Sequence, residues 1–223
     1  MTGKTLIEGN VDGMKNLFLT AVICISSLWL ACDLQAGTDS RRNQILMLRA
    51  KQDECSSNLK NFYSSLKLYA SLNQGNLPEK NNFAGLNELT RHGITYSEFY
   101  CKNYRGKKYK YKAKESKKNK ERKKFTEANS PYIYFGGINL NDAVNSTPKL
   151  VIMCDKPNSR HLNVLLADGS VIKIESGKGR DKISNTADIV NALNKRYKYP
   201  AVIFQALCNK AKSIDAELRK WEK

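Results

Sequence analysis

The chain has 223 residues, enough for one domain with a hydrophobic core plus extensions, or for two small domains at most. Its 38 Lys and Arg against 21 Asp and Glu give a net charge of +17, which favours an anionic partner. The charge is concentrated, however, because residues 102–124 hold thirteen Lys and Arg against two Glu, a net +11 that leaves +6 for the rest. The remaining chain is only mildly basic. An intracellular nucleic-acid binder is the least favoured function, because the apolar residues 17–32 argue against it.

An uncharged apolar segment occupies residues 17–32, between Lys15 and Asp33. Its 16 residues are fewer than the roughly 20 that a membrane-spanning helix needs, and they suit the core of an export signal. We therefore predict a protein that is exported or anchored in a membrane. The alternative is a buried hydrophobic helix, which the polar residues 33–39 disfavour because they separate it from the next amphipathic segment.

Three processing sites compete in this region. A general signal peptidase, which requires small residues near the cleaved bond, would cleave after Ala36. Ala31 followed by Cys32 resembles a degenerate lipobox, in which the Cys is lipidated. Residues Gly3 to Glu8 resemble the prepilin cleavage motif, in which the chain is cut after the Gly and the Glu guides subunit packing.

The prepilin-like segment departs from that motif in two ways. Lys4 stands where a Phe is usual, and the polar residues 9–13 replace the apolar run that should come directly after Glu8. A translation start at Met14 would remove the segment altogether.

Residues 40–78 predict one long amphipathic helix that Asp39 or Ser40 can cap. Its end is indicated by residues 73–75, which include a Gly, and by Pro78. The apolar stripe at spacings of three, four or seven comprises Ile45, Leu48, Cys55, Leu59, Phe62, Leu66 and Tyr69.

Parts of this helix resemble the first soluble helix of bacterial pseudopilin-like proteins. The matching residues are Cys55, Asn58, Leu59 and Lys60, then a Tyr-Ala pair and a Gly…Pro ending. Cys101, in a Phe-x-Cys sequence, resembles the Cys that comes after the long helix in that family.

Residues 102–124 predict a solvated insertion loop, because a segment this charged buries too little apolar surface to order itself. Tyr side chains lie between its lysines, so the alternative is a site for anionic lipid or an anionic polymer. The candidate ligand residues are Lys107, Lys108, Lys110 and Lys112.

Four short segments rich in β-branched and aromatic residues predict strands at 132–135, 149–154, 161–167 and 170–175. The last two are joined by Asp168-Gly169, which predicts a hairpin with a two-residue type I′ turn. His161, Asn163, Asp168 and Gly169 resemble the His…Asn-Val-x-x-Ala-Asp-Gly motif of prepilin-type processing-associated proteins. Six residues separate His161 from Asp168, where that family has nine.

Two helices are predicted in the tail, one from Thr186 to near Lys198 and one after Pro200. We expect them to pack against the sheet, with a helix offered to a partner as the alternative. The second helix has one apolar face, made of Val202, Ile203, Leu207, Ile214 and Leu218.

Four cysteines outside the apolar segment permit one or two disulfides whose pairing the sequence leaves open, or they are reduced. They are Cys55, Cys101, Cys154 and Cys208. No CxxC, GxSxG, HExxH or complete phosphate-binding loop occurs, and the acidic residues of the strand region lack the spacing of a calcium site. We therefore expect no enzyme, no metal and no cofactor.

These patterns predict an α+β fold in which a long N-terminal helix packs on a small antiparallel sheet, with C-terminal helices added. The expected organisation is an export signal or membrane anchor at 1–38, a pilin-like domain at 39–183 with its basic insertion, and a helical extension at 184–223. The resemblance implies a non-catalytic subunit or accessory of a type II secretion or type IV pilus-like assembly.

The partners implied are other pilin-like subunits or secretion-system components, and the inner membrane, with the soluble part facing the periplasm. The interruption at residues 33–39 leaves an alternative. In it, the chain is an exported or lipid-anchored binding domain that keeps a pilin-like fold, no longer polymerises, and binds an anionic ligand through its basic loop.

Overall fold

The computed structural model describes residues 42–47, 49–50, 52–92, 94, 130–157, 162–174 and 183–221. The chain divides into two units, residues 1–50 and 51–223. In the first unit, the described residues from 42 onward are helical. Ile45 is 50% exposed there. Leu48 lies outside the described residues.

In the second unit, residues 52–72 form a helix that buries one apolar stripe. Cys55, Leu59, Phe62 and Leu66 are at most 1% exposed, as their spacing predicts. Near the end of the helix Ala70 is buried, whereas Tyr69 is only partly so. The helix stops where the sequence indicates, with positive φ angles of 55° at Gln74 and 84° at Gly75.

The predicted strands form one antiparallel sheet with the order β1-β2-β3-β4. Every residue of the first three strands is buried, whereas the β4 residues are partly or fully exposed. The strands are β1 (Tyr132–Tyr134), β2 (Val151–Asp155), β3 (Leu162–Leu166) and β4 (Val171–Ile174).

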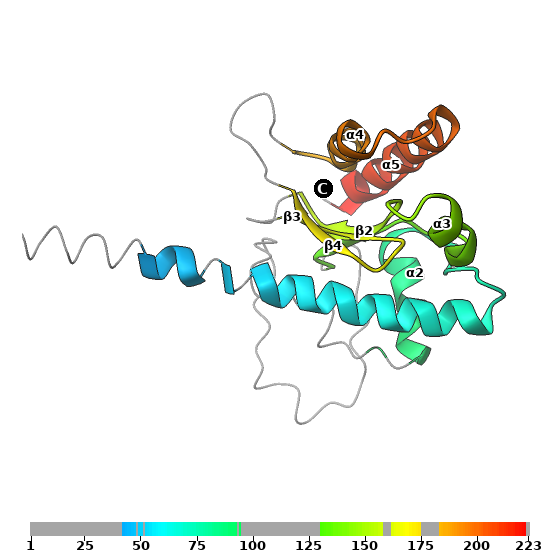
Figure 1. Cartoon of the computed structure of the whole chain (residues 1–223), viewed down its shortest axis with the longest axis horizontal. Helices are drawn as coiled ribbons and strands as arrows, with labels where there is room; N and C mark the ends of the chain where they lie inside the picture. The colour runs from blue at the N-terminus through cyan, green and yellow to red at the C-terminus, as the bar shows by residue number, and fades with distance from the viewer. Residues whose placement is uncertain are drawn as a thin grey trace, which may run out of the picture. The chain divides into compact units, whose positions relative to one another are not determined.

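Both faces of this sheet are covered, which produces two separate cores (Figure 1). Because successive strand residues point to opposite faces, Tyr132 and Tyr134 join the core under helix 52–72 and α2 (Asn82–Leu89), while Ile133 joins the other core. That second core lies under α4 (Thr186–Tyr197) and α5 (Ala201–Trp221). The predicted α+β class is confirmed, as is the packing of the C-terminal helices on the sheet.

Two features of the helices differ from the prediction. The short helix α3 (Leu140–Ser146), capped by the side chain of Asn139, has no counterpart among the predicted elements. In α5, Leu207 and Ile214 are buried as predicted, but Val202 is 81% exposed. Ile203 and Phe204 in the same turn pack against the core, whereas Val202 lies on the opposite side of α5 from the buried Leu207, Ala211 and Ile214.

A one-turn 3₁₀ helix η1 (Thr90–His92) comes directly after α2. Among the helices that the structure describes, none combines the length and the apolar character that crossing a bilayer requires.

Candidate functional site at the Asp168–Gly169 turn

The predicted hairpin is present, but its turn is not the expected type I′. Leu165 pairs with Val171, and the N–H of Gly169 donates to the carbonyl of Leu166 at 2.9 Å. Gly169 has a φ of 80°, and Asp168 is not among the residues with positive φ. A type I′ turn needs positive φ at both central residues, so the connection is instead a three-residue loop with its glycine in the left-handed region.

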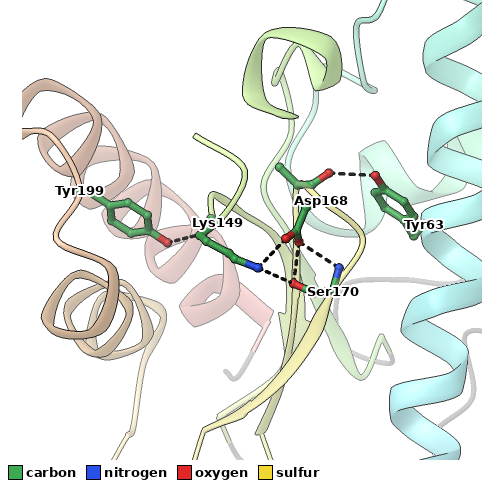
Figure 2. Close-up of polar contacts among 6 residues, drawn as sticks. Tyr63, Lys149, Asp168, Ser170 and Tyr199 are labelled. Atoms are coloured by element: carbon green, nitrogen blue, oxygen red, sulfur yellow. Dashed lines mark hydrogen bonds and ion pairs between the residues drawn. The ribbon is translucent and has the colours of Figure 1, made fainter. Parts of the chain in front are cut away.

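Gly169 is required here for a second reason, which is the closeness of helix 52–72. A Cβ atom at this position would lie 2.4 Å from the ring of Tyr63, closer than any side chain tolerates. The Tyr63 hydroxyl donates to the carbonyl of Ala167 at 2.9 Å, so the turn rests directly on the tyrosine (Figure 2). Burial, together with the smaller effect of the Asp168 charge, raises the pKa of Tyr63.

The carboxylate of Asp168 accepts hydrogen bonds from both Lys149 and Ser170 (Figure 2). It accepts from Lys149 Nζ at 2.5 Å, from Ser170 Oγ at 2.6 Å and from the Ser170 N–H at 3.0 Å. Partial burial acts to raise the pKa of Asp168, but these hydrogen bonds outweigh it and the pKa is lowered. The bond to Asp168 in turn raises the pKa of Lys149.

The same loop is tied to the C-terminal layer through the segment before β2. The N–H groups of Ala167 and Asp168 donate to the carbonyls of Leu150 and Pro148. On the far side of that segment, the Tyr199 hydroxyl donates to the carbonyl of Lys149 at 2.7 Å. The motif turn therefore connects helix 52–72, the sheet and the α4–α5 connection.

The open end of the hairpin is attached to the same helix. Asn163 is fully buried, and its side-chain amide donates to the carbonyl of Gln52 at 3.4 Å. Its backbone N–H donates to Asp155 Oδ2 at 2.8 Å. Burial raises the pKa of Asp155 to about 7, against the opposing effect of the Asn163 bonds. The motif residues Asn163 and Gly169 thus fix the hairpin on the helix at its two ends.

The helix motif contributes to the same interface. Asn58 donates to the hydroxyl of Tyr132 at 3.4 Å, and Leu59 is in the core, whereas Lys60 is exposed. Cys55 is disulfide-bonded. Cys154 and Cys208 are free, so pairings that use either of them are not formed.

Many predicted site residues lie outside the described residues. These are Gly3, Glu8, Ala31, Cys32, Ala36, Cys101, Lys107, Lys108, Lys110, Lys112 and His161. The structure does bring together Cys55, Leu59, Asn163 and Gly169 between helix 52–72 and the hairpin. The Asn58 side chain contacts Tyr132 of β1 instead, and that of Asp168 contacts Lys149 and Ser170.

The polar side chains of this interface hold backbone segments in place. Asp168 is held ionised by Lys149 and Ser170, which leaves it a poor proton acceptor. Within the described part of the chain, no group of three or more His, Cys, Asp or Glu side chains is arranged to hold a metal ion.

Sequence reasoning missed Tyr63, Lys149 and Asp155. Tyr63 is adjacent to the buried Phe62 in the helix, so its place beside the stripe is a usable signal. Lys149 lies 19 residues from Asp168, and no local pattern links them. Asp155 ends a strand, where a carboxylate is normally expected to reach water.

Comparisons of the chain with family models, with curated proteins and with solved structures gave no match in any of the three. The pilin-like motifs therefore remain a resemblance.

Proposed function

We propose that the chain is a non-catalytic, pseudopilin-like structural or accessory subunit of a type II secretion or type IV pilus-like envelope assembly. The observation that carries the proposal is the interface between helix 52–72 and the β3–β4 hairpin. Four of the residues that resemble the two family motifs lie in it, namely Cys55, Leu59, Asn163 and Gly169. The polar side chains of this interface, Tyr63 and Asn163, bond to backbone carbonyls and hold the hairpin on the helix, which supports a structural role.

A structural role also agrees with the coverage of the sheet. Both faces are packed under helices, so the described part presents side chains on helix surfaces and loops as its contact surfaces. Partners would be other pilin-like subunits or secretion-system components, with the chain anchored in the inner membrane and its second unit in the periplasm.

The test is the mature N-terminus, determined by mass spectrometry on protein recovered from envelope fractions. Prepilin processing predicts a chain that begins at Lys4, and Gly3→Val should leave the precursor uncut. Ala36→Lys serves as the matched control, because it blocks a general signal peptidase and should not affect cleavage after Gly3. A terminus at Cys32 or Gly37 would overturn assembly through a prepilin-type N-terminus.

A second candidate function is favoured by the polar residues 33–39, which interrupt the apolar segment before the helix. In this alternative the chain is an exported or lipid-anchored binding domain that does not polymerise and binds an anionic ligand through residues 102–124. Salt-sensitive binding to an anionic polymer that is lost when residues 102–124 are deleted would favour it. Binding unchanged by that deletion would exclude it.

A further inference from the structure

The C-terminal end of α4 and its connection to α5 carry a group of exposed cations. Lys195, Arg196 and Lys198 are all exposed. We call Lys195, Arg196, Lys198 and the exposed Val202 the cationic tip.

The chain around this tip carries no carboxylate of its own, and the nearby Asp168 is paired with Lys149. Residues 189–214 contain no Asp or Glu. Asp188 and Asp215 flank that stretch, and both act at the other end of α4, where they accept hydrogen bonds from backbone N–H groups at its start. The length of α4, 12 residues or about 18 Å, separates the two charge groups.

The cations are not needed to complete the helix end. Lys198 adopts a left-handed conformation, and its N–H caps the carbonyl of Asn194. The N–H of Tyr199 donates to the side chain of Asn194 at 3.0 Å. The Arg196 guanidinium is positioned 5.5 Å above the ring of Tyr197. The positive side chains are therefore available at the surface while the backbone beneath them is fixed.

Val202 adds an apolar element to this charge. It is 81% exposed, the largest exposed fraction among the large hydrophobic side chains of the described residues, and lies four positions after Lys198. A single exposed valine is ordinary on a protein surface. An exposed apolar side chain that is close in sequence to several cations suits the interface of a negatively charged bilayer, which offers both phosphates and an apolar layer.

We propose that the cationic tip docks on an anionic lipid surface, with its Lys and Arg side chains on lipid phosphates and Val202 in the interface. The complementary charges select an anionic surface, and Val202 favours a lipid over a soluble polymer because only a lipid offers an apolar layer. This surface is independent of the pseudopilin proposal and of residues 102–124.

The test places a photoreactive benzoyl-phenylalanine at Val202 of the full chain, with the same group at Leu72 as the control. Leu72 is also apolar and is 65% exposed, but it lies on helix 52–72 and outside the cationic tip. Vesicles of phosphatidylcholine with phosphatidylglycerol are compared with phosphatidylcholine alone. We expect lipid adducts at position 202 on the anionic vesicles, whatever else in the chain binds the membrane, and few at position 72.

The double variant R196E/K198E should lower the adduct yield at position 202 by about tenfold or more. K60E/K67E, which reverses two exposed lysines of helix 52–72, should leave it within about twofold. Equal adducts at positions 202 and 72, or a yield that R196E/K198E leaves unchanged, would overturn the proposal. So would a result in which R196E/K198E weakens binding to soluble polyphosphate while the lipid adducts persist.

Discussion

The two faces of the sheet are covered by helices in different ways. Under helix 52–72 the core is mainly aliphatic, as on the other face, and includes the Phe62 and Tyr132 rings in an edge-to-face contact at 5.4 Å. Hydrogen bonds join both ends of the β3–β4 hairpin to that helix. Under α4 and α5 the core is mainly aliphatic, and Asp215 links the two helices to each other.

This difference separates two roles. Apolar contacts are non-directional and bury surface in many arrangements, whereas a buried hydrogen bond is satisfied in one geometry only. The helix 52–72 face therefore fixes both ends of the hairpin directly. The α4–α5 layer closes the second core and reaches the hairpin only through the segment before β2, where Tyr199 donates to the carbonyl of Lys149. Substitutions on the first face should disturb position as well as stability, while those on the second should lower stability alone.

The largest effect should come from Phe62→Ala. Phe62 is fully buried between the helix and the sheet, and truncating such a ring costs about 3–5 kcal/mol of unfolding free energy. Urea unfolding monitored by circular dichroism measures it. Leu68→Ala is the control, since Leu68 is 50% exposed on the same helix and should cost about 0.5 kcal/mol. Equal losses would mean that the helix does not pack on the sheet as described.

Asp155→Asn should change how stability depends on pH. The folded pKa of about 7 lies above the unfolded value near 4, so the folded state binds the proton more tightly. The stabilising contribution of Asp155 is therefore full below about pH 4 and is lost as pH rises through about 7. Between about pH 4 and pH 7, the unfolding free energy of the native protein should fall by up to about 4 kcal/mol relative to that of Asp155→Asn.

Unfolding midpoints of both proteins across this pH range would measure the effect. Asp142→Asn, at an exposed carboxylate on α3, is the control and should run parallel to the native curve. Parallel curves for Asp155→Asn as well would show that Asp155 is not buried in the folded state.

Gly169→Ala should cost about 2–3 kcal/mol, because alanine is strained at a φ of 80° and its Cβ would meet the Tyr63 ring. In a Tyr63→Ala background the clash is absent, and the added cost should fall to about 1 kcal/mol. A double-mutant cycle measured by urea unfolding gives the coupling between the two sites. Additive costs would show that the turn does not rest on Tyr63.

The parts predicted from sequence are those that local periodicity determines. The stripe at Cys55, Leu59, Phe62 and Leu66 results from helical spacing, and the hairpin results from two strand-like runs joined by Asp168-Gly169. The type of turn at Asp168-Gly169 could not be predicted from these local patterns. Asp-Gly occurs in hairpin loops of both two and three residues. The pairing of Leu165 with Val171 determines that the three-residue loop forms here.

The missed elements depend on partners that are distant in the sequence. Helix α3 is too short to show a period, and it forms because Asn139 caps it while Leu140 and Ala143 are buried. Lys149 reaches Asp168 only once the segment before β2 lies beside the hairpin loop. The error at Val202 has another cause, because helical spacing itself places this residue away from the face that Leu207, Ala211 and Ile214 bury.

The smallest effect separates the second face from the first. Asp215 of α5 accepts hydrogen bonds from the N–H groups of Thr186 at 2.9 Å and Ala187 at 3.3 Å, the first two residues of α4. Asp215→Ala leaves these groups without that acceptor and should cost about 1 kcal/mol, whereas the exposed Ser213→Ala should be neutral. Because this contact joins two helices of one layer, hydrogen exchange should rise in α4 and stay unchanged in the β3–β4 hairpin. Faster exchange in the hairpin would mean that the α4–α5 layer also fixes the position of the strands. The two faces of the sheet would then not have separate roles.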